Sequence, residues 1–551
     1  MTSIRKLNDD VLFIVFSFLE RKDALAASYC AKRFYHLAIT AAFRSFKISK
    51  DQWKDENGWG LRENTRKIVT FSELLQRKDR LYKGLHRGRH LRRLALRSMD
   101  GPDFLHFPIL LTAADRLQKL LLDSFEYVLS ENNPVAEVIG NMGELKQLII
   151  RDVGPWTIER LPAILSAKKL ISLSLTLDKS FYQDVVDAKF DLASLAASVS
   201  AAPALRSLHI SAIDIPAFYE ARPSYRMSSL KRLSLICLRD VSAAFIDLCD
   251  TLEMCAIEPE QYSDAVLDIP AAGQPPLQVA ELHLLRCIGI STETARRVGE
   301  VGLISLGGII TPLSGIDDVR PLVPLLQSAR PIAVEVFSAG ELTDGEQMWH
   351  GLFQGAPRLR YLEITVTDGD CNIADYKAML LAALRCTAIS YLNLYCLPGC
   401  GPLPVDMLWG DVASEEEESH REAERVFAEG LASIPYELAA GLPALRVIAM
   451  SHSRAIEARV AENEMWNGGW GDGERVNLSW PDSRLSRESA KGTRVDRWWR
   501  VEVDGSNRRP VEISREEAEV MREEIQRADF DIATTLKAAK LAAGRLLQAL
   551  R

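Results

Sequence analysis

Residues 7–38 are unusually rich in apolar positions. Eight of the eleven residues from Asp9 to Leu19 are apolar. A helix with a single buried stripe shows apolar residues only at i, i+3, i+4 and i+7, so this segment predicts a helix that is apolar on nearly every side. Such a helix needs cover on two sides, and a module of about forty residues rarely buries enough surface to provide both. The pattern therefore predicts a helical module that binds a partner protein.

A secretory signal peptide is the alternative interpretation of the same residues. Basic residues precede the apolar run, and small residues follow it at 24–26, in the order of such a signal. Asp9 and Asp10 argue against it because they adjoin the apolar run, and residues 20–23 are all charged where a cleavage region is neutral. The apolar pattern also resumes at Leu25. These flanks favour a folded helical domain.

A set of apolar, acidic and basic residues with a characteristic spacing extends over 32 residues of this segment. Its positions are Leu7, Asp9, Asp10, Val11, Val15, Phe16, Leu19, Asp23, Leu25, Cys30, Lys32, Arg33 and Phe34. An initial Leu, an acidic pair, an apolar helix, an Asp-bearing turn and a final Lys-Arg-Phe together resemble an F-box. Asn8 and Arg21 stand where that family has proline, and Ala24 stands where leucine is common. Asn8 retains the ability to cap a helix.

The resemblance implies a partner and a set of contacts. An F-box docks on the adaptor subunit of SCF (cullin-RING) ubiquitin ligases, and through the adaptor on a cullin. The apolar positions expected to bind the adaptor are Leu7, Val11, Leu12, Val15, Phe16, Leu19, Leu25 and Phe34. The resemblance by itself implies nothing about the substrate.

Beyond residue 90 a second pattern recurs, apolar-x-x-apolar-x-apolar. Clear copies begin at Leu91, Leu117, Leu145, Leu205, Leu230 and Leu359, and weaker ones at Leu170, Leu252, Val279, Val301, Pro331, Ile389 and Leu445. Most intervals fall near the roughly 20–29 residues of a leucine-rich repeat, and helix-like stretches lie between copies at 157–168, 240–250, 317–328 and 375–385. The pattern favours a solenoid of degenerate repeats, and an ordinary α/β domain with recurring Leu-rich strands is the alternative.

These patterns predict an α/β chain in four parts. An F-box domain at 1–50 precedes a basic linker or solenoid N-cap at 51–90. A leucine-rich-repeat-like solenoid, with parallel strands inside and helices outside, occupies 91–454 and contains an insertion at about 397–440. Five of the ten tryptophans lie between 455 and 510, which predicts a Trp-rich cap with C-terminal helices at 455–551. A partner-binding helix is the alternative for the end of that region.

Composition narrows the class of protein. The 551 residues are 47% apolar and 26% charged, as in ordinary globular proteins. No run approaches the roughly 18 apolar residues of a membrane span, so no membrane partner is expected. The net charge of −8 is the wrong sign for a nucleic-acid binder. Nine cysteines without a C-x-x-C pair predict reduced thiols, as in the cytoplasm or nucleus, rather than a zinc site.

Motifs of nucleotide binding, metal hydrolysis and serine hydrolysis are missing from the sequence. The sequence therefore predicts a protein that is not an enzyme and has no cofactor or metal. Between Arg77 and Arg97 there are nine Lys or Arg and one acid. The three interpretations, in decreasing order of preference, are a solvated helix face, a site for an acidic or phosphorylated ligand, and a nucleic-acid contact. The nucleic-acid contact is last because no aromatic residues alternate with these charges to stack on bases.

A protein that binds targets needs a binding surface. Side chains alternate between the two faces of a strand, so the positions beside the apolar ones should line the inner face of the solenoid. The residues proposed from this reasoning are Arg93, Arg97, Lys119 and Arg151 at a basic end, and Tyr361, Tyr391 and Tyr395 at an aromatic end. Together with the F-box resemblance, this predicts the substrate receptor of an SCF ubiquitin ligase, with an acidic or phosphorylated target protein. The alternative is a repeat scaffold or inhibitor without a ligase.

Overall fold

The computed structural model describes residues 8–19, 21–49, 60–76, 87–97, 106–130, 134–177, 190–212, 217–218, 226–236, 246, 248–250, 252–258, 266–267, 278–285, 289–290, 295–296, 298–310, 322–339, 353–368, 373–385, 387–398, 429, 432–453, 494–505 and 507–527. The chain divides into two compact units, unit 1 (Met1–Thr251) and unit 2 (Leu252–Arg551). Each unit is described by itself.

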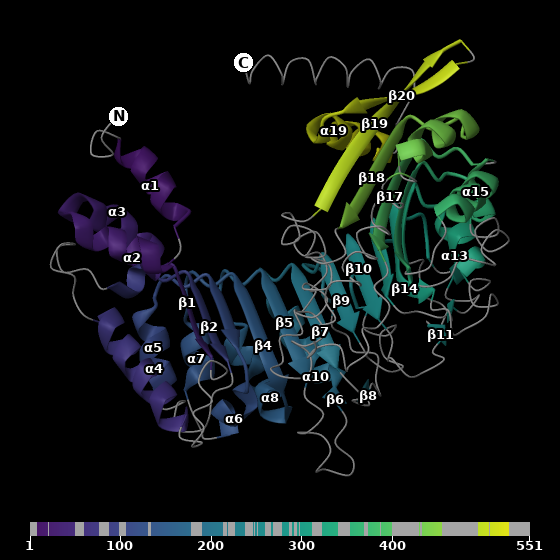
Figure 1. Ribbon diagram of the computed structural model, residues 1–551. Coiled ribbons are helices and arrows are strands. Elements are labelled where there is room, and N and C mark those ends of the chain that lie inside the picture. Colours follow the sequence, from purple (N-terminus) through teal and green to yellow (C-terminus); the bar gives the residue numbers. More distant parts are fainter. Residues whose placement is uncertain are drawn as a thin grey trace, which may run out of the picture. The chain divides into compact units, whose positions relative to one another are not determined.

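Unit 1 begins with three helices, α1 (Asp9–Ser17), α2 (Arg21–Cys30) and α3 (Lys32–Phe43), which Figure 1 shows in purple. Asn8 caps α1, because its side-chain oxygen accepts a hydrogen bond from the backbone N–H of Asp10 at 3.4 Å. The cap predicted from the sequence is therefore confirmed. After α3 and Arg44 the chain enters strand β1 (Ser45–Ser49).

The helices of unit 1 lead into a parallel sheet. Its strands, in order across the sheet, are β1, β2 (Arg93–Arg97), β3 (Lys119–Leu122), β4 (Gln147–Val153), β5 (Ser172–Leu177), β7 (Ser207–Ala212) and β9 (Arg232–Ile236). Neighbouring strands pair in parallel throughout this series. The two-residue strands β6 (Phe190–Asp191) and β8 (Ala217–Phe218) form a separate small parallel sheet.

Helices alternate with these strands. They are α4 (Gly60–Gln76), the 3-10 helix η3 (Arg87–His90), α5 (Phe107–Ala113), α6 (Phe125–Ser130), α7 (Val135–Gly140), α8 (Pro155–Ile164) and α10 (Leu192–Ser200). Figure 1 shows α5, α7 and α8 along one face of the sheet. The pattern leucines, such as Leu94, Leu120 and Leu148, are fully buried. A strand with its helix cannot enclose such side chains alone, so neighbouring strand–helix pairs must stack.

Unit 2 has the same alternation within itself. Its parallel strands are β10 (Met254–Glu258), β12 (Glu281–Leu285), β14 (Leu303–Ile310), β15 (Ala333–Ala339), β16 (Tyr361–Asp368), β17 (Tyr391–Pro398) and β18 (Val447–Ser453). Its helices include α13 (Leu322–Ala329), α15 (Ile373–Leu384) and a helix at residues 432–441. The short strands β11 (Val266–Leu267) and β13 (Gly289–Ile290) pair in parallel by themselves.

The direction of pairing changes at the end of unit 2. Strand β19 (Arg494–Asp504) pairs antiparallel with β18, and β20 (Asn507–Ile513) pairs antiparallel with β19. Helix α19 (Arg515–Gln526) follows β20 directly. Trp498 and Trp499 lie in β19, while the other three tryptophans of the predicted cap and most of the predicted insertion at 397–440 lie outside the described residues.

The recurring sequence pattern predicts where the parallel strands are. Each of its thirteen starting residues lies two positions before an observed strand, as Leu91 does before β2 and Leu445 before β18. The predicted strands are therefore confirmed at these positions, and α8, α13 and α15 confirm three of the helix-like stretches. The fourth, at 240–250, lies largely outside the described residues.

One strand of the sheet escaped the prediction. Residues 45–49 fall inside the segment predicted as the F-box domain, but they form β1 and pair in parallel with β2. Phe43, Phe46 and Ile48 have the same spacing as the other copies of the pattern. The sequence thus contained the pattern for β1. The strand was missed because this copy is far from the next one, which begins only at Leu91.

A repeated backbone contact ties neighbouring strands together. The carbonyl oxygen of Arg44, directly before β1, accepts hydrogen bonds from the N–H groups of Arg92 and Arg93 at 2.9 and 3.0 Å. The residue before each later strand up to β7 accepts the same two bonds from the next strand, at Arg92, Gln118, Lys146, Ile171 and Arg206. We call this series the carbonyl ladder. It holds equivalent residues in the same place from strand to strand.

The buried carboxylate of Glu126, in α6, holds the start of α8. It accepts hydrogen bonds from the backbone N–H groups of Gly154, Trp156 and Thr157 at 2.9, 2.6 and 2.9 Å, and from Thr157 Oγ1 at 2.7 Å. Gly154, the residue before the helix, provides no side-chain cap. A carboxylate is favoured at this end of a helix because the free N–H groups point at it.

We expect Glu126→Gln to lower the free energy of unfolding of unit 1 by about 2 kcal/mol, because a neutral amide accepts weaker bonds and turns an NH2 group toward donors. Glu159→Gln, at an exposed position of α8, serves as the control and should change it by less than about 0.5 kcal/mol. Urea unfolding followed by circular dichroism measures both. Equal stability of the two variants would contradict the capping role.

Candidate protein-interaction surfaces

Helix α1 is buried on one side by its own helical module. Leu12 and Phe16, four residues apart, form a buried cluster with Ala38 of α3. The rings of Phe16 and Phe34 meet edge to face, with centroids 5.4 Å apart and an interplanar angle of 73°. This geometry is a favourable one for aromatic pairs. The contacts fix α1 against α3 and determine which side of α1 remains outside.

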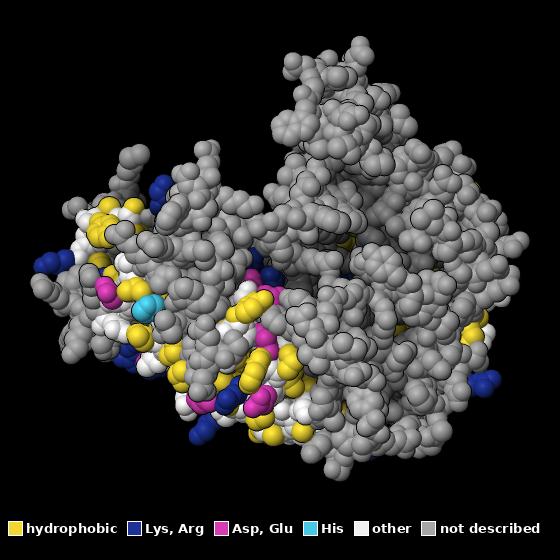
Figure 2. Space-filling view, turned by 90° about the horizontal axis from the view of Figure 1, so that it is seen from below, with side chains coloured by type: hydrophobic (Ala, Val, Ile, Leu, Met, Phe, Trp, Pro, Cys, Tyr) yellow, Lys and Arg dark blue, Asp and Glu magenta, His cyan; other side chains and the backbone are white. Residues whose placement is uncertain are grey.

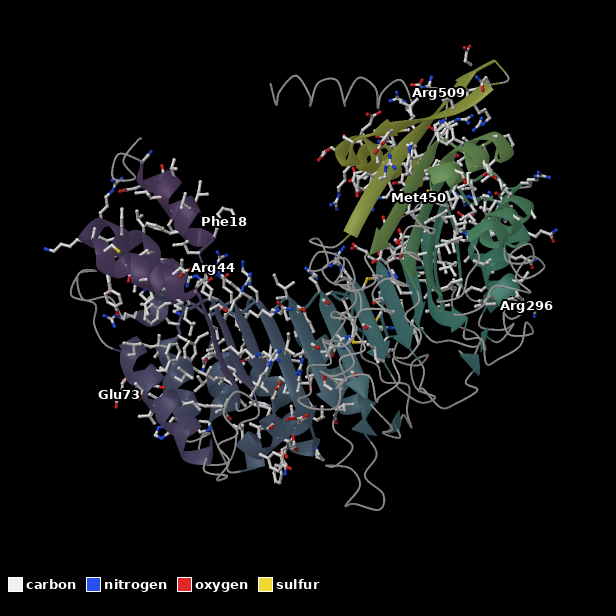
Figure 3. The ribbon with its side chains drawn as sticks, viewed as in Figure 1. Phe18, Arg44, Glu73, Arg296, Met450 and Arg509 are labelled. Atoms are coloured by element: carbon white, nitrogen blue, oxygen red, sulfur yellow. The ribbon has the colours of Figure 1, made fainter. Side chains whose placement is uncertain are left out.

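The other side of α1 is apolar and exposed. Val11, Ile14, Val15 and Phe18 are 44%, 57%, 42% and 83% exposed. They recur at i, i+3, i+4 and i+7, so they lie in one stripe along the helix and its end. We call these four residues the α1 stripe, and Figure 3 labels Phe18 at its end. Removing apolar surface from water lowers the free energy by about 25 cal/mol per Å². The α1 stripe therefore favours association with another apolar surface.

The residues predicted to bind the adaptor fall into distinct places. Val11 and Val15 lie in the α1 stripe, whereas Leu12 and Phe16 lie in the core of the helical module and not on its surface. The remaining predicted contacts are half-buried, at Leu19, Leu25 and Phe34, or outside the described residues, at Leu7. Leu12 and Phe16 therefore hold α1 against α3, which already covers that side of the helix.

Two members of the α1 stripe were missed from the sequence. Ile14 and Phe18 are its most exposed residues, and they share helical spacing with Val11 and Val15. That spacing was readable in the sequence. A helix that is apolar nearly all round shows two such stripes, however, and only the position of α3 decides which one is covered.

The basic end of the predicted sheet face comes together in unit 1. Arg93 of β2 is the register partner of Lys119 of β3, and Arg97, four residues along β2, lies on the same face because side chains alternate. The guanidinium of Arg151 lies 3.7 Å from the carboxylate of Asp123, and both side chains are largely buried. Arg93 is exposed, and Arg97 and Lys119 are half-buried. Of the four predicted cations, Arg151 is therefore the one largely buried beside a carboxylate.

Hydroxyl groups surround one buried histidine in the middle of this face. His209 of β7 is the register partner of Ser174 of β5 and Ser234 of β9. Its Nδ1 lies 2.9 Å from Ser234 Oγ. Burial lowers the pKa of His209 to about 4, because the charged form cannot be solvated there. At neutral pH this part of the face is therefore polar and uncharged.

The aromatic end of the predicted face is covered by the chain itself. Tyr361 and Tyr391, 1% and 3% exposed, form a buried cluster with Met521 and Ile525 of α19. The prediction that these two tyrosines line an open surface is wrong, because α19 buries its apolar side on them. Tyr395, four residues beyond Tyr391 in β17 and therefore on the same face, is half-buried.

Polar groups beneath α19 are paired with one another. Tyr361 Oη donates a hydrogen bond to Glu363 Oε2 at 2.7 Å, and Asn393 Nδ2 donates to the same oxygen at 2.9 Å. Burial, reinforced by the negative charge of Glu363, raises the pKa of Tyr361 well above its ordinary value. The phenol therefore remains a donor at all working pH values. This network makes the covered face a packed interior.

No cluster of three or more His, Cys, Asp or Glu side chains in the part of the chain that the structure describes is arranged to hold a metal ion. None of the described helices has the length and apolar character needed to cross a bilayer. On the face seen in Figure 2, described hydrophobic side chains are interspersed with acidic and basic ones.

The buried His209 should make unit 1 sensitive to acid. Its pKa is about 4 in the folded protein and about 6.5 in an unfolded chain, so the unfolded state binds the proton more readily and stability falls as the pH drops from about 6.5 toward 4. We expect His209→Asn, which keeps a donor near Ser234, to reduce the loss of unfolding free energy between about pH 7 and 4.5 by roughly 2 kcal/mol.

Urea unfolding at the two pH values measures this difference. His36→Asn, at an exposed position of α3, is the control and should leave the acid sensitivity of the parent protein unchanged. An unaltered pH dependence in His209→Asn would show that the histidine is not held neutral in the folded state.

The helical module matches a known domain family. Residues 4–44 match the F-box domain, a range that includes all of α1, α2 and α3. The full sequence has no match among curated proteins. Among solved structures, the chain is similar to one chain of the crystal structure of the Rad7 and Elc1 complex in yeast, with 14% identity, a TM-score of 0.30 and coverage of 70% of this chain and 88% of that chain. Residues 4–44 of this protein are therefore an F-box domain, and the α1 stripe is part of it.

Proposed function

We propose that this protein is a non-catalytic substrate-recognition subunit of an SCF (cullin-RING) ubiquitin ligase. Its F-box domain binds the adaptor subunit, and through the adaptor a cullin. Its α/β region binds the target protein. The observation that carries this proposal is the α1 stripe, an exposed apolar surface on a domain whose family docks on that adaptor.

The size of the α1 stripe sets how much of the adaptor interface it supplies. Full burial of a Val, Ile or Phe side chain is worth roughly 1.5–3 kcal/mol, so covering four partly exposed ones contributes about 4–6 kcal/mol. A micromolar complex needs about 8 kcal/mol after all costs. The adaptor therefore also contacts other exposed positions of the domain, and Tyr29 of α2, 78% exposed, is the first candidate.

The buried side of α1 has a different role in this proposal. Leu12 and Phe16 hold α1 against α3, so they orient the α1 stripe without contacting the adaptor. Substituting either residue would lower adaptor binding through loss of the helical module. Substitution of an α1 stripe residue would lower it directly and leave the fold intact.

We further propose that the α/β region is a solenoid of degenerate leucine-rich repeats between the F-box domain and a Trp-rich C-terminal cap. The thirteen strands at the predicted positions support this proposal. The target surface is the basic end of the sheet face of unit 1, around Arg93, Arg97 and Lys119, with Tyr395 a secondary candidate in unit 2. The reduced thiols expected from the sequence fit a protein of the cytoplasm or nucleus.

The mechanism that follows is one of proximity. The protein holds a target near the ubiquitin-charged enzyme that the cullin recruits, and a tethered target reaches an effective concentration far above its free one. Orientation of the reacting groups accounts for the rate gain. No side chain of this chain takes part in bond making or breaking.

Val15→Asp tests the proposal, because it introduces a charge into the middle of the α1 stripe at a position that is already partly in water. We expect affinity for the purified adaptor to fall at least tenfold, about 1.4 kcal/mol, while the thermal unfolding midpoint stays within about 2 °C. Isothermal titration calorimetry with the full-length chain measures the affinity.

Ile109→Asp is the matched control. Ile109 is an aliphatic residue of α5 with 47% exposure, outside the F-box domain, and its substitution should leave adaptor affinity unchanged. Equal affinity of Val15→Asp and the parent protein for the adaptor would contradict the assignment of the α1 stripe as the adaptor-binding surface. A repeat scaffold that acts without a ligase would then be the better description.

A further inference from the structure

A row of basic side chains runs along one edge of the sheet in unit 1. The row consists of residues directly before the strands, which the carbonyl ladder holds in equivalent places. From β1 to β9 these residues are Arg44, Arg92, Gln118, Lys146, Ile171, Arg206 and Lys231. Five of these seven are Arg or Lys. We call those five residues the basic edge.

The basic edge is open to solvent. Arg44, Lys146, Arg206 and Lys231 are exposed, and Arg92 is half-buried. Arg92 Nη1 donates to the carbonyl oxygens of Arg89 and Arg116 at 2.8 and 3.1 Å, and Arg206 Nη1 donates to that of Ser229 at 2.9 Å. These contacts orient the guanidinium groups on neutral oxygens and leave their charge in place. Figure 3 labels Arg44 at this edge of the sheet.

One acidic side chain near this edge already responds to its charge. Glu144, in the turn before β4, accepts a hydrogen bond from Lys169 at 2.8 Å. That bond and the charge of Lys169 lower the pKa of Glu144, and the charges of Arg116 and Lys146 lower it further. A carboxylate placed along the edge is therefore in a favourable field.

The fold does not require charge at these positions. In unit 2 the residues directly before the parallel strands are Glu253, Ala280, Gly302, Ile332, Arg360, Ser390 and Arg446, of which two are basic and one is acidic. Its backbone bonds have the same lengths of about 3 Å. Because a neutral or acidic residue serves the ladder equally well, the basic row in a chain of net charge −8 needs a reason other than folding.

The length of the row fits an extended polypeptide. Neighbouring strands lie about 4.8 Å apart, so the six spacings from β1 to β9 span about 29 Å. An extended chain advances about 3.3 Å per residue, so about nine residues cover the row. Carboxylates on such a segment could contact several of the cations together.

The neighbouring side chains favour a peptide over a nucleic acid. The first residues of the seven strands lie next to the edge. In strand order they are Ser45, Arg93, Lys119, Gln147, Ser172, Ser207 and Arg232. Hydroxyl and amide groups hydrogen-bond well to peptide groups. Single-stranded nucleic acids are held by base stacking on aromatic rings, and none of the fourteen residues at these two sets of positions is aromatic.

We propose that the basic edge binds an extended acidic segment, about nine residues long, of the target protein. The inference rests on the proposed function for the identity of the bound protein as a target, and it adds the chemical class of the segment and its place. The segment lies along the strand ends that begin at Arg44, the last residue of the F-box domain. Its carboxylates face the cations, and its peptide groups face the hydroxyl and amide side chains.

A fluorescein-labelled peptide of twelve glutamates tests the proposal with the full-length protein in an anisotropy titration. The parent protein should bind it, and affinity should fall as salt rises, because at about 0.1 M salt charges beyond about 10 Å are screened. The variant Lys146→Glu/Arg206→Glu/Lys231→Glu should bind at least about tenfold more weakly. The milder Lys146→Gln/Arg206→Gln/Lys231→Gln should lose several-fold and serves if the first variant folds poorly.

The control variant Arg296→Glu/Arg509→Glu/Arg515→Glu changes the net charge equally at exposed positions of unit 2, two of which are labelled in Figure 3. It should bind within about twofold of the parent protein. Equal loss in both variants, or no binding by the parent, overturns the proposal. Tighter binding of a twelve-nucleotide oligothymidine than of the peptide also overturns it, in favour of a nucleic acid.

The same variants separate this inference from the proposed function. Retained adaptor affinity in Lys146→Glu/Arg206→Glu/Lys231→Glu, with loss of the peptide, supports the inference and shows that the F-box domain is intact. If Val15→Asp leaves adaptor binding unchanged while the peptide still binds at the basic edge, the ligase assignment fails and the acidic-segment site stands.

Discussion

Parallel pairing in register is the constraint on which the described parts of this molecule depend. Each of the thirteen predicted strands begins two residues after the first apolar position of its pattern, and within each unit the residue between them is hydrogen-bonded to a neighbouring strand in the carbonyl ladder. Equivalent residues therefore repeat at intervals of one strand spacing. Side chains of one kind at such positions, before or within the strands, form a row across the sheet. The buried leucines of one face and the basic edge of unit 1 both follow from this repetition.

The F-box domain shows how an excess of apolar residues leaves an apolar surface exposed. A short helix with two apolar stripes can bury only one of them on a module of three helices. In α1 the stripe of Leu12 and Phe16 goes to α3, and the α1 stripe stays in water. The exposed side is thus a direct consequence of the small size of the module.

The two ends of the predicted binding face differ because only one is covered by its own unit. In unit 2, α19 places Met521 and Ile525 on Tyr361 and Tyr391, and the tyrosines become part of an interior with paired polar groups. In unit 1 the cations around Arg93 remain accessible. Aromatic side chains are buried by apolar groups of the same chain, whereas charged groups resist burial, so the basic end is the one that stays in contact with solvent.

Local patterns in the sequence determined much of this protein. The F-box helices, the cap at Asn8 and thirteen strand positions were all readable, because each depends on residues within one helix or one strand. Tertiary structure alone decided that β1 joins the sheet, that α3 covers Leu12 rather than Val15, and that α19 covers Tyr361. Those outcomes depend on contacts between residues far apart in the chain. Several apolar surfaces could pack against the same helix, and the local sequence does not show which of them does. Periodicity shows that a side chain needs burial, but only packing selects its partner.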